Sequence, residues 1–265
     1  MALEPLESLS PLILIIFSVG GLVLGSFASA MIHRIPLGEG VFGSAERSAC
    51  PQCKTTLGVR DLVPLFSWLF SKGKCNHCRK PIPVFYPLIE LSSCVLALVI
   101  LFMYEAEHLA EQVLVLLSLP FLLALVVIDF RHKILPNRLL LVLFSIGAIR
   151  LGLVLWLEQE EAMALLVEFI GGAFIYGLIS LSMAFLMEKI LKKKALGMGD
   201  VKFFAVAGLW LGLSSLGVFC ILSGILGVLL GLAWKHIHKE PAFPFGPALI
   251  LSFFTLLLLN SSHLL

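Results

Sequence analysis

Long apolar runs recur along nearly the whole chain, and they limit the possible folds more than any other feature. A spanning helix needs about 20 predominantly apolar residues. With 59% hydrophobic and 14% charged residues, the chain has too little polar surface to cover a water-soluble globule. We therefore expect an all-α polytopic membrane protein with about eight transmembrane helices, at roughly 12–32, 86–104, 112–129, 139–157, 162–187, 201–213, 216–234 and 244–260.

The segment from 201 to 234 allows two interpretations. Gly212, Ser214, Ser215 and Gly217 interrupt its apolar character. These residues mark either a tight turn between two spans or a kink within one.

Lysine and arginine predict the orientation, because basic residues stay on the cytoplasmic side during insertion. Four loops carry eighteen of the nineteen lysine and arginine residues, and only Arg150 lies elsewhere. These loops are 33–85, 130–138, 188–202 and 235–243. The opposite side carries only acidic groups, namely Glu4, Glu7, Glu105, Glu107, Glu111, Glu158, Glu160 and Glu161. We therefore expect cytoplasmic basic loops and both termini outside. The net charge of +2 does not indicate nucleic-acid binding.

Four cysteines lie in the one sizeable polar segment, 33–85. Cys50 and Cys53 form one C-x-x-C pair, and Cys75 and Cys78 form a second after twenty-one intervening residues. This arrangement is typical of two knuckles that close four thiolates around zinc. Cytoplasmic thiols are kept reduced, which favours structural Zn²⁺ over disulfides. The alternative is a set of free or redox-active thiols.

Two aspartates are predicted at similar depth on the cytoplasmic side. Asp129 ends one apolar run, and Asp200 lies in Gly197-Met198-Gly199-Asp200-Val201-Lys202, directly before another. Two adjacent carboxylates share a proton, so the charged one activates water while the neutral one polarises a carbonyl. Gly197 and Gly199 allow close backbone approach. The pair suits an aspartic peptidase. The alternative for each residue taken alone is not catalytic: Asp129 would be a solvated charge at the end of a helix, and Asp200 a carboxylate favoured by a helix N-terminus.

Several further motifs accompany the cysteines and the aspartates. They are Gly25-Ser26-Phe27, Arg34-Ile35-Pro36, Arg47 to Cys53, Gly73 to Cys78, Tyr86 to Leu91, Asp129 with Pro136, Gly197 to Lys202, and Pro244 to Pro247. On these motifs, nearly the whole chain resembles the bacterial type IV prepilin peptidases, in the G-x-G-D class of intramembrane aspartic proteases. Ser29 and Asn137 stand where that family usually has asparagine and aspartate.

The resemblance implies a specific enzyme. Asp129 and Asp200 would be the catalytic dyad, with Gly197, Gly199 and Lys202 in the supporting loop. The substrates would be prepilins and type II secretion pseudopilins, cut at the cytoplasmic face of the bacterial inner membrane between a basic leader and an apolar helix. The new N-terminus would then be methylated from S-adenosyl-L-methionine, with the first cytoplasmic loop involved. Both termini would be periplasmic.

The implied organisation has three parts. Residues 1–32 would form the first transmembrane helix, 33–85 the zinc loop associated with methyl transfer, and 86–265 the peptidase core in contact with membrane lipid. A carboxylate inside a span is costly and often functional. Glu90 is therefore a candidate for methyl transfer, and a boundary glutamate paired with Arg79 or Lys80 is the alternative.

Two other kinds of protein fit parts of the pattern. A proton-coupled transporter would use the same aspartates as relay groups, although such proteins tend to have repeated halves and midplane sites. A non-enzymatic assembly factor with a zinc module would not need either aspartate.

Overall fold

The computed structural model describes residues 10–39, 48–50, 52–104, 109–192, 196–240 and 242–260. Within these ranges the chain forms helices and no strand beyond two isolated bridges, which confirms the all-α prediction. Several predictions concern residues outside these ranges, namely Glu4, Glu7, Arg47, Pro51, Glu105 and Glu107, together with Lys193 and Lys194 among the basic residues of the 188–202 loop.

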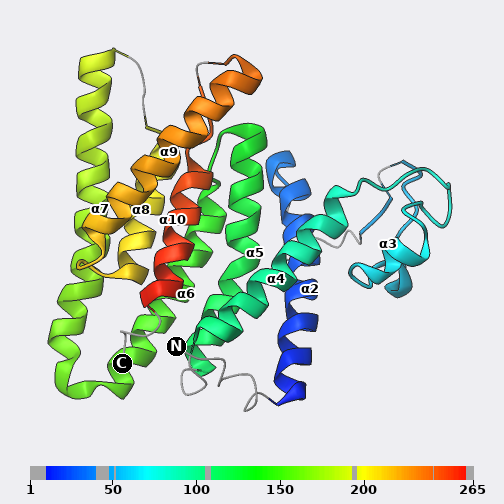
Figure 1. Cartoon of the computed structure of the whole chain (residues 1–265), viewed down its shortest axis with the longest axis horizontal. Coiled ribbons are helices and arrows are strands. Elements are labelled where there is room, and N and C mark those ends of the chain that lie inside the picture. The colour runs from blue at the N-terminus through cyan, green and yellow to red at the C-terminus, as the bar shows by residue number, and fades with distance from the viewer. Residues whose placement is uncertain are drawn as a thin grey trace. The chain divides into compact units, whose positions relative to one another are not determined.

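Six helices of the described part are long and apolar enough to cross a membrane. They are α2 (Pro11–Arg34), α4 (Phe85–Met103), α5 (Leu109–His132), α6 (Asn137–Leu157), α7 (Ala162–Leu191) and α9 (Leu216–His238) (Figure 1). The chain is therefore a multi-pass membrane protein. Shorter elements are α3 (Phe66–Phe70), α8 (Met198–Leu211), α10 (Gly246–Leu259) and the 3-10 turns η1 (Ile35–Leu37), η2 (Val59–Asp61) and η4 (Gln159–Glu161).

The predicted count of eight spans is not confirmed. A helix lies at each of the eight predicted places, but α8 and α10 have only 14 residues each. At 1.5 Å per residue each rises about 21 Å, which is less than the roughly 30 Å of a bilayer core. The run at 201–213 was predicted as a span on its apolar character although it is short, and the run at 244–260 is helical only at Gly246–Leu259.

The chain divides into two compact units, Met1–Ala124 and Leu125–Leu265. In the first unit, α2 packs along α4 through two glycines. A Cβ on Gly21 would lie 2.8 Å from the Cα of Cys94, and one on Gly25 would lie 2.6 Å from the Cα of Glu90. Small residues at such crossings let helix backbones approach closely in lipid. This contact fixes the end of α4 that carries Glu90.

In the second unit, α8 packs against α6, α7 and α10. Gly172 of α7 and Gly208 of α8 face each other, because a Cβ on either would lie within 2.6 Å of the other's carbonyl oxygen. Arg150 is buried at 2% exposure and donates from Nη1 to the Trp210 carbonyl at 3.1 Å. This cation therefore lies inside the unit rather than extending to the interface, and it helps to hold α6 against α8.

A turn separates α8 from α9, so the segment 201–234 contains two helices joined by a tight turn and not one kinked helix. Gly212 ends α8 at φ +75°, a left-handed value that favours glycine. Glu168 of α7 pins the turn, since its Oε1 accepts from the Ser214 N–H at 2.8 Å. The turn reverses the chain, so that α9 runs back toward the end of the unit where α8 begins.

The outer faces of α7 and α9 remain apolar and open. Ile170 and Phe174 on α7, and Ile221 and Ile225 on α9, are each more than half exposed. Such continuous exposed apolar faces are expected where lipid rather than water is the solvent.

Candidate active site

Asp129 lies in the last turn of α5 and is buried, with 4% of its surface exposed. Its Oδ2 accepts a hydrogen bond of 2.8 Å from the backbone N–H of Gly246, the first residue of α10. A Cβ on Gly246 would lie only 2.7 Å from that oxygen. The start of α10 therefore fits directly against the carboxylate, and only glycine leaves room for it.

Asp200 is the third residue of α8 and is half-buried. Its Oδ2 accepts from the Gly197 N–H at 3.1 Å, so the side chain caps its own helix. A carboxylate at a helix N-terminus is favoured by the unpaired N–H groups there. The Asp200 carboxyl group also interacts electrostatically with that of Asp129.

Leu135 lies between the two segments that carry the aspartates. A Cβ on Gly199 would lie 2.9 Å from the Leu135 Cβ, and a Cβ on Gly246 would lie 3.0 Å from its Cδ2. The structure thus brings together two acidic residues that are seventy-one positions apart in the sequence.

Lys202, predicted as a supporting residue, points to another partner. Its Nζ donates to Asn137 Oδ1 at 2.8 Å, which joins the first turn of α8 to the start of α6. Beyond the end of α5, Lys133 forms an ion pair with Glu240, and this pair lowers the pKa of the Glu240 carboxyl group. The Lys133 amine also lies 5.6 Å from the centre of the Trp234 ring. These contacts tie helix ends together around the aspartates.

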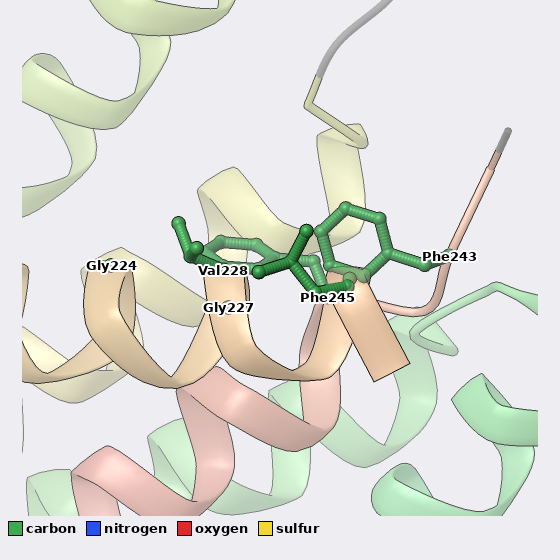
Figure 2. A pocket seen from close by; sticks show the side chains of 7 residues that line it. Gly224, Gly227, Val228, Phe243 and Phe245 are labelled. Carbon is green, nitrogen blue, oxygen red and sulfur yellow. The ribbon is translucent and has the colours of Figure 1, made fainter. Parts of the chain in front are cut away.

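An apolar groove of about 360 Å³ lies between α9 and the segment that leads into α10 (Figure 2). Gly224, Gly227 and Val228 of α9 form one wall, and the rings of Phe243 and Phe245 form the other. Phe245 directly precedes the glycine that donates to Asp129. Sequence reasoning missed the groove, although glycines at 224, 227 and 231 on one helix face were a signal for it.

The four loop cysteines gather in the first unit, as predicted. Their sulfur atoms all lie within 4.8 Å of one another, and Cys50 Sγ is 4.0 Å from Cys78 Sγ. Tetrahedral zinc with bonds of about 2.3 Å places its sulfurs roughly 3.8 Å apart. None of the cysteines forms a disulfide. The group could therefore hold a zinc ion without a large rearrangement.

Crowding and hydrogen bonds shift the pKa values of the cysteine thiols in opposite directions. Side-chain and backbone hydrogen bonds at Thr55 lower the pKa of Cys53 to about 6, which favours its thiolate. At Cys78 a backbone hydrogen bond from Lys80 lowers the pKa, but desolvation and three neighbouring thiols outweigh it and raise the value to about 11. Four crowded sulfurs cannot all be anionic without a cation between them. A divalent metal would supply that cation.

Each cysteine pair lies in the same local fold, repeated after twenty-five residues. The Lys54 N–H donates to the Cys50 carbonyl at 2.8 Å, and the Arg79 N–H donates to the Cys75 carbonyl at 2.9 Å. Lys54 and Arg79 both have positive φ, at 58° and 59°. We did not predict this repeat. In the sequence, its traces are the repeated C-x-x-C spacing and a basic residue directly after the second cysteine of each pair.

Glu90 is 8% exposed near the start of α4, and its Oε2 accepts from the Leu65 N–H at 2.7 Å. The Ser26 side chain also forms a hydrogen bond with it. These contacts differ from the predicted alternative, a boundary glutamate paired with Arg79 or Lys80. Glu90 instead connects the loop to α2 and α4, and it lines a cavity there.

Fold and site together define a class: a multi-pass helical membrane protein with two interacting carboxyl groups at helix ends and a separate tetracysteine loop. Residues 19–104 match the bacterial peptidase A24 N-terminal domain, and residues 116–232 match the type IV leader peptidase family. The chain belongs to the type IV leader peptidase family, as its sequence motifs predicted, and is thus an enzyme of the leader peptidase class.

Curated relatives match across most of their length. A type 4 prepilin-like proteins leader peptide-processing enzyme of Escherichia coli is 31% identical, over 89% of this chain and 90% of that protein. A prepilin leader peptidase/N-methyltransferase of Vibrio cholerae is 32% identical, over 91% and 94%. One of Neisseria gonorrhoeae is 30% identical, over 98% and 95%. No solved structure matches. This membership favours an enzyme over a transporter or an assembly factor.

Proposed function

We propose that Asp129 and Asp200 form a catalytic dyad that cleaves prepilins. The observation that supports the proposal is the position of Leu135, which lies against Gly199, next to Asp200, and against Gly246, whose N–H donates to Asp129. Between them the pair holds one proton and one negative charge. The charged carboxylate takes a proton from water as the water attacks the scissile carbonyl, and the neutral one donates a hydrogen bond to the carbonyl oxygen.

The substrates are type IV prepilins and type II secretion pseudopilins, cut between a basic leader and an apolar helix. Relatives named as prepilin leader peptidases support the first class. Asp129 and Asp200 lie at the cytoplasmic face and both termini in the periplasm of a bacterial inner membrane, an orientation that the distribution of basic residues supports. Gly197, Gly199 and Lys202 shape the loop that presents Asp200.

Cys50, Cys53, Cys75 and Cys78 hold a structural zinc ion. Four thiolates leave no open position for water, so this metal stabilises the loop rather than reacting. On this account, residues 1–32 form the first span, 33–85 a zinc loop that serves methyl transfer, and 86–265 the peptidase core.

The second activity is methylation of the new N-terminus. The names of the relatives support it, and S-adenosylmethionine is the expected donor. Glu90 serves this reaction rather than cleavage, because its carboxylate is buried beside the zinc loop. A Glu90→Gln variant that cleaves and methylates as wild type would exclude this role.

The cleavage proposal is tested with purified protein in liposomes and a peptide that joins a basic leader to an apolar helix. Asp129→Asn and Asp200→Asn should each abolish cleavage, because each removes one half of the acid–base pair. Both substitutions keep the size of the side chain. Cleavage that persists in either variant would eliminate the dyad.

A further inference from the structure

The first unit contains a cavity of about 450 Å³ beside the tetracysteine loop. Residues of α2, of the loop and of the start of α4 line it, so it is closed by segments from three parts of that unit. Its volume lies in the range of roughly 300–1,000 Å³ that small-molecule sites occupy.

Ser29 of α2 gives the first indication of a ligand. Only 4% of this residue is exposed, it lines the cavity, and its hydroxyl has no hydrogen-bond partner in the structure. A buried hydroxyl without a partner costs free energy, so most such groups find one. The oxygen has almost no accessible surface, so a polar ligand in the cavity would supply that partner once the serine side chain rotates toward it.

Glu90 gives the second indication. Glu90 lines the same cavity from α4, and the hydrogen bond from the Leu65 N–H leaves part of its accepting capacity unused. A buried carboxylate attracts a cationic group strongly, because little water screens it. The cavity therefore favours a ligand with a positive centre at this end.

The remaining lining suits a ligand with aromatic and charged parts. Trp68 and Tyr86 line the cavity with aromatic rings, the kind of side chain that stacks on a purine, and the Trp68 indole is oriented by its hydrogen bond to the Ile82 carbonyl at 3.2 Å. Arg34 and Lys74 are cationic groups suited to a carboxylate, while Asp61 is an acceptor for an ammonium group.

From these features we infer that the cavity binds S-adenosylmethionine, with the Ser29 hydroxyl and the Glu90 carboxylate as its innermost polar contacts. The inference rests on the proposed methyltransferase activity. When bound, the donor's methyl carbon bonds to the lone pair of the substrate amine as the C–S bond breaks, which leaves a neutral thioether and releases a proton from nitrogen to water. Glu90 faces the sulfonium and counters its charge before transfer.

The test measures binding without turnover. The full-length protein in nanodiscs is titrated with radiolabelled S-adenosylmethionine by equilibrium dialysis. Ser29→Ala should weaken binding about three- to tenfold, the usual effect of one lost hydrogen bond. Ser93→Ala is the matched control. Ser93 is also a buried hydroxyl without a partner, on α4, but it does not line the cavity.

Glu90 is tested by comparing two ligands. Glu90→Gln should weaken binding of S-adenosylmethionine at least tenfold, but it should affect S-adenosylhomocysteine much less, since that product lacks the sulfonium charge. A purely structural role of Glu90 would weaken both ligands equally, and that result would contradict the assignment.

The results for wild type and for the variants separate failure of the inference from failure of the proposed function. If wild-type protein does not bind the donor, the methyltransferase function fails and the inference with it. If wild type binds the donor and both Ser29→Ala and Glu90→Gln bind it as well as wild type does, the donor site lies elsewhere. The same conclusion follows if Ser93→Ala binds the donor as poorly as Ser29→Ala does. Asp129→Asn, which cannot cleave on our account, should bind the donor like wild type.

Discussion

The substitution Gly246→Ala should disable the peptidase while leaving the fold nearly intact. The new Cβ would lie 2.7 Å from Asp129 Oδ2, whereas ordinary contacts begin near 3.4 Å. The carboxylate must therefore move by roughly 0.7 Å. This costs little stability, because the displaced atom is the end of a side chain, and Gly246 has no positive φ that would strain alanine.

The displacement matters much more for catalysis than for stability. A misplacement of about 1 Å can reduce a rate about a hundredfold, so we expect kcat to fall between about tenfold and a hundredfold with little change in KM. The assay is cleavage of the leader–helix peptide by protein in liposomes, with thermal unfolding of each variant measured alongside.

Gly171→Ala on α7 is the matched control, because its Cβ would meet nothing within 4 Å. Gly171→Ala should cleave like wild type. If Gly246→Ala retains the wild-type kcat, or if both variants lose activity together, the Gly246–Asp129 contact does not position a catalytic group.

Three further results are expected. Metal analysis should find one zinc ion per chain. The double variant Cys50→Ala/Cys75→Ala should lose this ion, and its 52–85 segment should become sensitive to protease. A wild-type protein that contains no metal and still resists protease would contradict the zinc site. Asn137→Asp should form an ion pair with Lys202 near the surface, so unfolding stability should change by no more than about 1 kcal/mol and cleavage should persist. Gly212→Ala should lower the free energy of unfolding by about 1–3 kcal/mol, because φ at this residue is +75° and the new Cβ would lie 2.6 Å from Glu168 Oε1. Unchanged stability would contradict the described conformation of the α8–α9 turn.

The sequence predicted the helices because each apolar run is long and bounded by charged or turn residues. It also located both aspartates at points where an apolar run meets a basic loop, and this is the basis of the proposed pair. Depth in the membrane thus limits where two such residues can meet, even when they are far apart in the chain.

Other features could not be predicted, because they depend on contacts between segments. Nothing local at Gly246 indicates that its N–H reaches Asp129, and nothing near Ser29 indicates a cavity that the loop closes. The position of Arg150 likewise depends on the Trp210 carbonyl, which no helical pattern identifies as its partner. Apolar runs fix which helices form, whereas tertiary packing decides which polar groups they bring together.

The central claim is that Asp129 and Asp200 act as one unit. The most direct measurement is the residual single-turnover cleavage rate, with enzyme in large excess and long incubation, of Asp129→Asn, Asp200→Asn and the double variant. Groups that act together are strongly non-additive, so the double variant should be no slower than the slower single variant. If the two losses instead add as free energies, the aspartates act independently, and the account of a shared proton and a single activated water is wrong.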